Sequence, residues 1–272
     1  HRVIVVGTGF SGLCMGVKLR ENGEDDFVLL ERAGDVGGTW RDNTYPGCAC
    51  DVESHLYSFS FEPNPNWSRM YAPQPEIYAY LKHVATKYDL LRHIRFPANI
   101  THSRYDEARK VWIVQAEDGR VFEGDVLVSG MGGLSNPAIP DIKGLNTFEG
   151  TTFHSATWRH DYDLTGKRVA VIGSGASAIQ FVPAIAPLVD HLTYFQRTPP
   201  WVVPKMDRPI KPEEKADFAA NPWRQKIART KLYWTLEMRF LAFKFKPEWM
   251  KLVAKVGKHR INKAIKDPAL RA

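Results

Sequence analysis

Two glycine-rich stretches decide the fold of this 272-residue chain: Gly7-Thr8-Gly9-Phe10-Ser11-Gly12 and Gly173-Ser174-Gly175-Ala176-Ser177-Ala178. Each directly follows an apolar, β-branched run, at residues 3–6 and 169–172, and each precedes a helix-compatible segment, at residues 13–22 and 179–189. The order strand, glycine turn, helix is typical of a dinucleotide-binding βαβ unit, whose glycines permit a tight turn and close approach to a pyrophosphate. We therefore predict an α/β fold with two Rossmann-like domains.

The residue 24 positions after the first glycine differs in charge between the two copies: it is Glu31 in the first and Arg197 in the second. In a βαβ unit this position contacts the adenosine ribose. A carboxylate accepts hydrogen bonds from a free 2′-hydroxyl, whereas a guanidinium pairs with a 2′-phosphate. We therefore predict FAD in the first unit and NADPH in the second. The predicted FAD site includes Gly7, Gly9, Phe10, Ser11, Gly12 and Glu31, and the predicted NADPH site includes Gly173, Ser174, Gly175, Ala176, Ser177 and Arg197.

Charge is distributed unevenly along the chain. The net charge is +7, and residues 201–272 hold 18 Lys and Arg against 7 Asp and Glu, which gives this segment +11 and leaves −4 for the rest. Basic segments are typical of nucleic-acid-binding proteins. The aromatic residues here, however, recur at helical spacing beside Leu and Met, as core residues do. We therefore expect a helical insertion with a solvated basic face and no nucleic-acid partner.

Other features of the composition exclude further classes. No run reaches the roughly 20 apolar residues of a membrane helix, so we expect no integral membrane association. The three cysteines, Cys14, Cys48 and Cys50, suit a reducing compartment, and we expect a cytoplasmic protein. The pair Cys48-x-Cys50 lacks a second cluster of ligands, so no metal site is predicted.

The segments between the two glycine stretches predict a mixed architecture. Residues 34–73 are rich in Gly, Pro, Asn and aromatics, which favours a ligand-facing loop region. Residues 94–122 should form short strands with a hairpin turn at 117–120, followed by a strand at 125–129 and a linker at 137–144. A helix is expected over 75–88, with an apolar face formed by Ile77, Tyr80, Leu81, Val84 and Ala85.

The second unit is incomplete in this sequence. It begins near Thr165, and only two strands are visible where a mononucleotide-binding half normally has three. We expect the third strand to be supplied by sequence beyond Ala272. The predicted domains are an FAD-binding domain at 1–144, a linker at 145–164, the start of an NADPH-binding domain at 165–200 and a basic helical segment at 201–272.

The predicted linker carries a more specific motif. Phe148, Gly150, His154 and Trp158 match the F-x-G-x-x-x-H-x-x-x-W fingerprint of type I Baeyer–Villiger monooxygenases, which are class B flavoproteins that use FAD and NADPH. Family members commonly have Pro or Asp where Arg159 stands. The chain resembles this family over essentially residues 2–272. Further similar segments are 37–40, 45–47, 51–54, 57–59, 71–77, 134–137 and 195–199.

The resemblance implies functions for several residues. His154 and Trp158 would couple NADPH docking to domain movement, and His154 and Asp51 are the catalytic candidates. In the family, an arginine from a Lys-Arg pair, held by a carboxylate that aligns with Asp51, stabilises the charge that develops on oxygen. Here the pair Lys167-Arg168 begins a strand instead, so the chain resembles an N-terminal half that lacks the C-terminal part of the family fold. Further cofactor-binding residues implied by the resemblance are Arg32, Gly38, Thr39, Trp40, Asp51, Tyr57, Ile100, Trp158 and Thr198.

The implied activity is the insertion of one oxygen atom of O₂ next to a ketone carbonyl, through a flavin C4a-peroxide, to give an ester or lactone. The partners would be a small ketone and O₂, and the sequence specifies neither the ketone nor the oligomeric state. Two alternatives stay open: a flavin monooxygenase that oxidises N or S atoms, which usually has Phe or Tyr at the position of Trp158, and a truncated nucleotide-binding fragment without catalysis. A flavin disulfide reductase is disfavoured, because Cys48-x-Cys50 has the wrong spacing for its redox pair.

Overall fold

The computed structural model describes residues 1–198, 205–245 and 248–267. Contacts divide the chain into two compact units, one of residues 1–48 and 73–163 and the other of residues 49–72 and 164–272. The predicted domain boundary at residues 200 and 201 and the end of the predicted basic segment at 268–272 lie outside the described residues.

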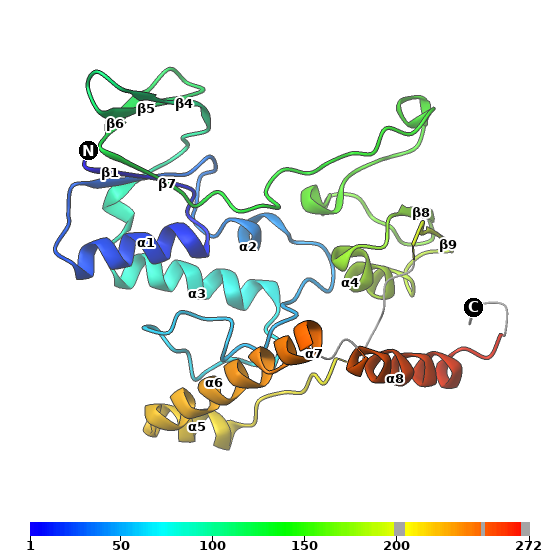
Figure 1. The fold of residues 1–272 in the computed structure, drawn as a ribbon. Coiled ribbons are helices and arrows are strands. Elements are labelled where there is room, and N and C mark those ends of the chain that lie inside the picture. Colours follow the sequence, from blue (N-terminus) through cyan, green and yellow to red (C-terminus); the bar gives the residue numbers. More distant parts are fainter. Residues whose placement is uncertain (199–204, 246–247, 268–272) are drawn as a thin grey trace. The chain divides into compact units, whose positions relative to one another are not determined.

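The first unit is built on a parallel sheet with the strand order β3-β2-β1-β7 (Figure 1). Its central strand β1 (Val3–Val6) pairs with β2 (Phe27–Leu30) and with β7 (Val126–Ser129), and β3 (Ile94–Arg95) extends the sheet beyond β2. Helix α1 (Phe10–Glu21) connects β1 to β2. The strand, helix and strand predicted over residues 2–31 are therefore confirmed.

Two different layers cover the faces of this sheet. Helices α1 and α3 (Gln74–Lys87) lie on one side, and an antiparallel sheet of β4 (Ile100–Asp106), β5 (Val111–Ala116) and β6 (Val121–Gly124) lies on the other (Figure 1). Because side chains alternate along a strand, Ile4, Val28 and Leu30 pack with Val114 of the antiparallel sheet. All five apolar residues predicted on the inner face of α3 are buried.

Short elements complete the first unit. A single helical turn, α2 (Thr39–Asp42), follows the double glycine, and 3₁₀ turns occupy η1 (Leu91–His93), η2 (Leu145–Thr147) and η3 (Ser155–Thr157). The predicted linker at 137–144 contains neither helix nor strand and is exposed throughout. This linker thus connects β7 to the segment that carries the predicted fingerprint, and its residues are not part of the core.

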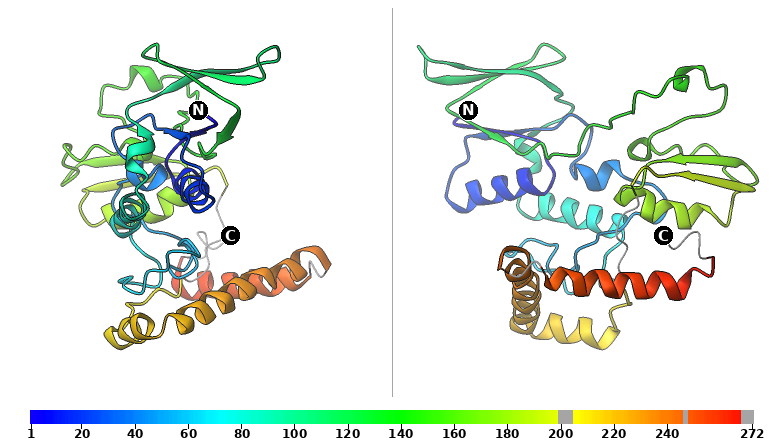
Figure 2. Two further views of the ribbon diagram at one scale, coloured as in Figure 1. Left: turned by 90° about the vertical axis from the view of Figure 1, so that its left-hand side faces the viewer. Right: turned by 45° about the vertical axis from the view of Figure 1, so that its right-hand side comes forward.

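The second unit begins with a smaller βαβ unit. Strand β8 (Arg168–Ile172) runs parallel to β9 (His191–Phe195), and α4 (Ala176–Ile185) connects them, as the yellow-green segment of Figure 2 shows. Within the described residues these two strands form a separate sheet, which agrees with the two strands found in the sequence. The basic segment is helical: α5 (Pro212–Ala220), α6 (Pro222–Glu237), α7 (Arg239–Phe245) and α8 (Trp249–Ala264).

Residues 49–72 group with the second unit, although the sequence assigned them to the first domain. Gln180 of α4 donates a hydrogen bond to the carbonyl of Ala49 at 2.8 Å and accepts one from its N–H at 3.2 Å. Arg229 of α6 donates to the carbonyls of His55 and Leu56 at 2.9 and 3.0 Å. These bonds join residues more than 100 positions apart, so local sequence patterns do not reveal them.

Six aromatic residues of the basic segment are another correction, because they are exposed rather than buried in a core: Trp223, Tyr233, Trp234, Phe240, Phe243 and Phe245. Trp223, Trp234 and Phe243 are 58%, 59% and 62% exposed. Helix α6 instead packs on residues 49–72 through polar side chains, notably Gln225, which is 4% exposed. Helical spacing of aromatics alone does not tell a buried face from a solvent-facing one. Among the described helices, none combines the length and the hydropathy that crossing a bilayer requires.

Candidate functional site

The first glycine turn is packed so closely that side chains are excluded from it. Gly7 has a φ of +97°, and a Cβ atom there would lie 2.6 Å from the carbonyl oxygen of Gly130. A Cβ atom at Gly12 would lie 1.8 Å from the carbonyl oxygen of Gly7. Since real Cβ atoms do not approach backbone this closely, both glycines are required by the turn itself. The turn thereby brings the start of α1 against the ends of β1 and β7.

The N-terminus of α1 faces a second glycine. Gly9 is the N-cap residue of α1, and among the described residues no side-chain hydrogen bond caps this helix start. Gly38 has a φ of +52°, and a Cβ atom on it would lie 3.1 Å from the Cα atom of Gly9. Backbone N–H groups at a helix start are typical of phosphate sites. Phe10, Ser11 and Gly12 form the first turn of this helix.

Glu31 follows the last residue of β2 and turns toward the glycine turn, where it is 3% exposed. Its Oε2 atom accepts hydrogen bonds from the N–H of Thr8 at 3.0 Å and from its hydroxyl at 2.6 Å. Its Oε1 atom accepts one from the N–H of Ala33 at 3.0 Å and forms an ion pair with Nη1 of Arg41 at 2.8 Å. A buried carboxylate is stable only when such partners replace water, and here each oxygen has two.

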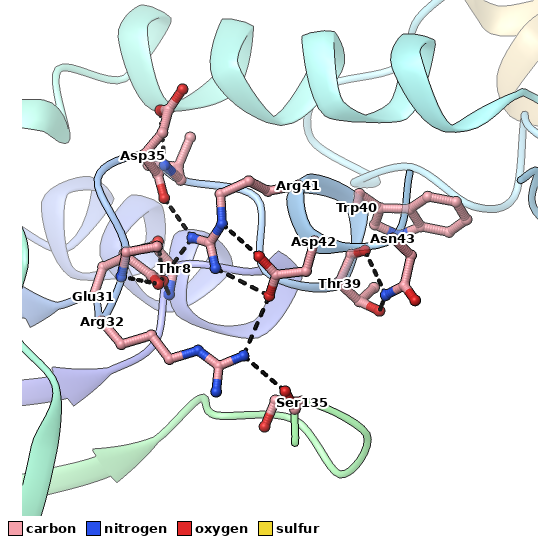
Figure 3. A network of polar contacts seen from close by, with 12 residues as sticks. Thr8, Glu31, Arg32, Asp35, Thr39, Trp40, Arg41, Asp42, Asn43 and Ser135 are labelled. Atoms are coloured by element: carbon pink, nitrogen blue, oxygen red, sulfur yellow. Dashed lines mark hydrogen bonds and ion pairs between the residues drawn. The ribbon is translucent and has the colours of Figure 1, made fainter. Parts of the chain in front are cut away.

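Arg41 and Arg32 extend this cluster into a network (Figure 3). Burial alone would lower the pKa of Arg41, but its hydrogen bond to Asp42 and the charge of Glu31 outweigh burial and raise the pKa. Arg32 donates to Asp42 at 3.3 Å, to the carbonyl of Ser135 at 2.7 Å and to the side chain of Asn136 at 2.7 Å. The network therefore ties the end of β2 to α2 and to the loop after β7.

Three other predicted cofactor-binding residues of the first unit make contacts that do not involve Glu31. Thr39 begins α2 and accepts hydrogen bonds at its hydroxyl and carbonyl from the side chain of Asn43, each at 3.0 Å. Trp40 is 8% exposed, and its carbonyl accepts a hydrogen bond from Gln74. Ile100 begins β4 and packs against the core cluster between the two sheets.

The second glycine turn also connects a strand to a helix, but its glycines are less closely packed than those of the first turn. Gly173 has a φ of +108°, and its N–H donates to the carbonyl of Phe195 at 2.9 Å. A Cβ atom at Gly175, the N-cap residue of α4, would meet no described atom within 4 Å. Protein packing therefore does not explain the glycine at 175, whereas close approach of a phosphate would. Ala176 and Ser177 begin α4, and Ser174 donates from its hydroxyl to the carbonyl of Thr198 at 3.0 Å.

The prediction that Glu31 and Arg197 occupy equivalent positions is wrong by one residue. The first glycine of each turn bonds to the last residue of the neighbouring strand, Gly7 to Leu30 and Gly173 to Phe195. Glu31 is the residue directly after its strand, whereas Arg197 is the second residue after Phe195. The segment from glycine to strand end is one residue shorter in the second copy. Arg197 is exposed, and within the described residues no ion pair is recorded for it.

Asp51 and Tyr57 belong to the second unit. Asp51 is exposed, and Tyr57 is half-buried, with its N–H bonded to the carbonyl of Glu53 at 2.9 Å. Burial raises the pKa of the Cys48 thiol and raises that of Cys50 to about 11, so both stay protonated at neutral pH. Across the part of the chain that is described, no three His, Cys, Asp or Glu side chains form a metal site.

The fingerprint histidine has a structural contact in the first unit. Nδ1 of His154 accepts a hydrogen bond from the N–H of Ala156 at 3.1 Å and so caps η3. Trp158 follows this turn and contacts Phe153 edge to face, with ring centroids 5.2 Å apart. Both His154 and Trp158 are half-buried. The two residues thus flank η3 on either side.

Sequence reasoning missed four residues that complete the Glu31 cluster. Thr8 lies inside the glycine stretch, but its hydroxyl was given no function. Arg41 and Asp42 are adjacent in sequence and resemble an ordinary surface pair, and Asn136 lies more than 100 residues from its partner Arg32. Two of the four had a sequence signal: Thr8 precedes Gly9 by one position, and Asn136 lies in segment 134–137, which resembles the monooxygenase family.

The chain is similar to known flavoproteins along nearly its whole length. Residues 1–258 match the family described as flavin-binding monooxygenase-like. A Baeyer-Villiger monooxygenase of Pseudomonas aeruginosa is 54% identical over 270 residues, which are 99% of this chain and 51% of that protein. One of Streptomyces coelicolor is 53% identical over 271 residues, which are 100% of this chain and 52% of that protein.

Solved structures agree with these relatives. An open crystal structure of cyclohexanone monooxygenase matches 99% of this chain and 60% of its own, with a TM-score of 0.85 and 32% identity. An oxidized steroid monooxygenase bound to NADP matches 99% of this chain and 58% of its own, with a TM-score of 0.85 and 35% identity. The chain spans about half the length of the curated relatives it matches. It belongs to the flavin-binding monooxygenase-like family.

Proposed function

We propose that the chain binds FAD in its first unit and NADPH in its second, as part of a Baeyer–Villiger monooxygenase. The observation that carries this proposal is the pair of βαβ units with different charges after their second strands. A buried carboxylate, Glu31, lies beside the first glycine turn, and an exposed cation, Arg197, lies beside the second. The relatives named Baeyer-Villiger monooxygenase support the reaction class.

The residues of the first unit fit FAD. The closely packed turn at Gly7 and Gly12 leaves backbone amides rather than side chains at the start of α1, and such amides bind a pyrophosphate. Glu31 would accept the ribose hydroxyls, and Arg32 would lie beside the adenosine. Thr39 and Trp40, at the start of α2, would face the flavin end of the cofactor.

The residues of the second unit fit NADPH. Gly175 leaves room at the start of α4 for the pyrophosphate, and Arg197 would pair with the 2′-phosphate through its guanidinium. Because NADH has a hydroxyl at that position, this pairing would make the second site selective for NADPH. Thr198, which is bonded to Ser174, would fix the start of the loop beside this phosphate.

The reduced flavin supplies the activated oxygen that converts a ketone to an ester or lactone in this class of enzyme. The chain's own residues would orient the two cofactors and exclude water. The exposed carboxylate of Asp51 would hold a cation near the oxygen on which negative charge develops. The turn between His154 and Trp158 would transmit NADPH docking to the segment that precedes β8. A small ketone and O₂ are the proposed partners, and the free thiols Cys14, Cys48 and Cys50 support a cytoplasmic location.

The test combines cofactor binding with product analysis. We expect the purified protein to be yellow, or to become so when FAD is added, and to consume NADPH. Incubation of the complete monooxygenase, of which this chain is proposed to be a part, with cyclohexanone should yield the lactone, detected by mass spectrometry with ¹⁸O₂ as the oxygen source. Oxidation of a thioether without any lactone would favour an N- or S-oxidising flavin monooxygenase. Protein that stays colourless with FAD would contradict the proposal and favour a nucleotide-binding fragment without catalysis.

A further inference from the structure

The carboxylate proposed to bind the FAD ribose has all of its acceptor positions filled by the protein. An ionised carboxylate offers about four lone-pair positions. Glu31 uses two on Oε2 for Thr8 and two on Oε1 for Ala33 and Arg41. A ribose hydroxyl can therefore donate to Glu31 only if one of these donors withdraws.

The four donors differ in how easily they can withdraw. The N–H groups of Thr8 and Ala33 belong to the backbone and are fixed by the glycine turn and the end of β2. The Thr8 hydroxyl comes from a fully buried residue and lies 2.6 Å from Oε2. The Arg41 side chain is 12% exposed, and it approaches Glu31 from α2 rather than from the strand. Arg41 is therefore the donor that a ligand can displace.

Arg41 keeps most of its own partners when it releases Glu31. Its Nε and Nη2 atoms donate to the carboxylate of Asp42 at 2.8 and 3.1 Å, and its Nη1 donates to the carbonyl of Asp35 at 2.5 Å. Figure 3 shows the guanidinium between Asp35, Asp42 and Glu31. Withdrawal from Glu31 removes one of four contacts and leaves the guanidinium paired with Asp42, so no uncompensated buried cation is created.

We propose that Arg41 occupies the ribose-binding oxygen of Glu31 before FAD binds and is exchanged for the 2′-hydroxyl of the adenosine when FAD enters. This inference rests on the proposed function. It assigns to Arg41 a positioning function, which determines how much the ribose 2′-hydroxyl contributes to the affinity for FAD. The exchange replaces one charge-assisted hydrogen bond by another, so the hydroxyl adds little net affinity in the unmodified protein.

The test compares FAD with an FAD analogue whose adenosine lacks the 2′-hydroxyl. The ratio of their dissociation constants, measured by flavin fluorescence, isolates the hydroxyl from the diphosphate and the flavin. We expect a ratio below about threefold in the unmodified protein. In Arg41→Met, which keeps the aliphatic stem but removes the donors, Oε1 is open, and the ratio should rise to about tenfold or more, the affinity of a hydrogen bond to a charged group.

Arg109→Met is the matched control, because Arg109 belongs to the first unit and pairs on the surface with Glu123 at 2.8 and 2.5 Å, outside the Glu31 cluster. Its ratio should equal that of the unmodified protein. A ratio that is unchanged or lower in Arg41→Met would overturn the exchange. If that variant does not fold, a ratio above about tenfold in the unmodified protein would also overturn it. Absence of FAD binding by the unmodified protein would instead refute the proposed function itself.

Discussion

Replacing Glu31 by glutamine tests the buried carboxylate most sharply, because the two side chains have the same shape. A carboxamide has one oxygen and one NH₂ group, and the NH₂ group must take the position of one carboxylate oxygen. On one side it meets the N–H and hydroxyl of Thr8, and on the other it meets the N–H of Ala33 and the guanidinium of Arg41. The Thr8 hydroxyl can rotate to accept from the NH₂ group, but either orientation still leaves at least one N–H facing a donor in a site that is 3% exposed.

The expected cost of Glu31→Gln follows from this geometry. A buried polar group without a partner costs about 1–3 kcal/mol, and breaking a buried ion pair costs about 3–5 kcal/mol. Arg41 retains Asp42 as a partner, so the lower end of the second range applies. We expect the free energy of opening the first unit to fall by about 3 kcal/mol. That loss corresponds to roughly a hundredfold faster exchange of its protected amides.

Hydrogen exchange followed by mass spectrometry measures this opening in peptides of β1 and β2, separately from the second unit. Glu123→Gln is the matched control, since Glu123 also pairs with an arginine, Arg109, at 2.8 and 2.5 Å, but on the surface. Surface pairs contribute little to stability, so this variant should exchange at the original rate. Equal exchange in the Glu31→Gln variant and the original protein would refute the reasoning.

Three other predictions follow from the same geometry. Arg197→Ala should weaken NADPH binding by about 1.5–3 kcal/mol, the value of a hydrogen bond to a charged group, and leave FAD content unchanged in calorimetric titrations; equal loss of both cofactors would show that Arg197 serves another site. Gly7→Ala should abolish FAD binding, because the new Cβ would lie 2.6 Å from the carbonyl oxygen of Gly130. Gly34→Ala is the control and should bind FAD normally, because a Cβ there would have no atom within 4 Å. Retention of FAD by the Gly7→Ala variant would contradict the close packing of the turn. Burial raises the pKa of Cys50 to about 11, and the thiolate is the nucleophile, so Cys50 should resist iodoacetamide at pH 8 and react only as the pH approaches 11. Rapid labelling at pH 8, detected by peptide mass spectrometry, would contradict its burial.

Local patterns predict the elements around the first site well. The β-branched runs, the glycine turn and the apolar spacing of α3 each depend on neighbouring residues, and the structure confirms β1, α1, β2 and the buried face of α3. The hairpin strands β4 to β6 are likewise visible in sequence. Their position over the parallel sheet depends on contacts such as Val114 with Ile4, which no local pattern contains.

The candidate site is less predictable, because its contacts are not local. Glu31 is found by its spacing from Gly7, but its binding partner Arg41 resembles a surface residue until the fold turns it inward. Counting from the glycine also fails at Arg197, because the second copy is one residue shorter before its strand ends. The grouping of residues 49–72 with α6 depends on hydrogen bonds from Gln225 and Arg229, which are polar residues in a helix whose aromatics are exposed.

The central claim is that one chain holds two nucleotides at separate sites. It is tested most directly by titrating the protein with FAD to saturation and then adding NADP⁺, which cannot reduce the flavin, while the bound flavin is followed by fluorescence anisotropy. We expect one FAD per chain, retained as one NADP⁺ binds to the second unit. Release of FAD in proportion to the NADP⁺ bound would show that both nucleotides compete for a single site, and would contradict the assignment of two sites.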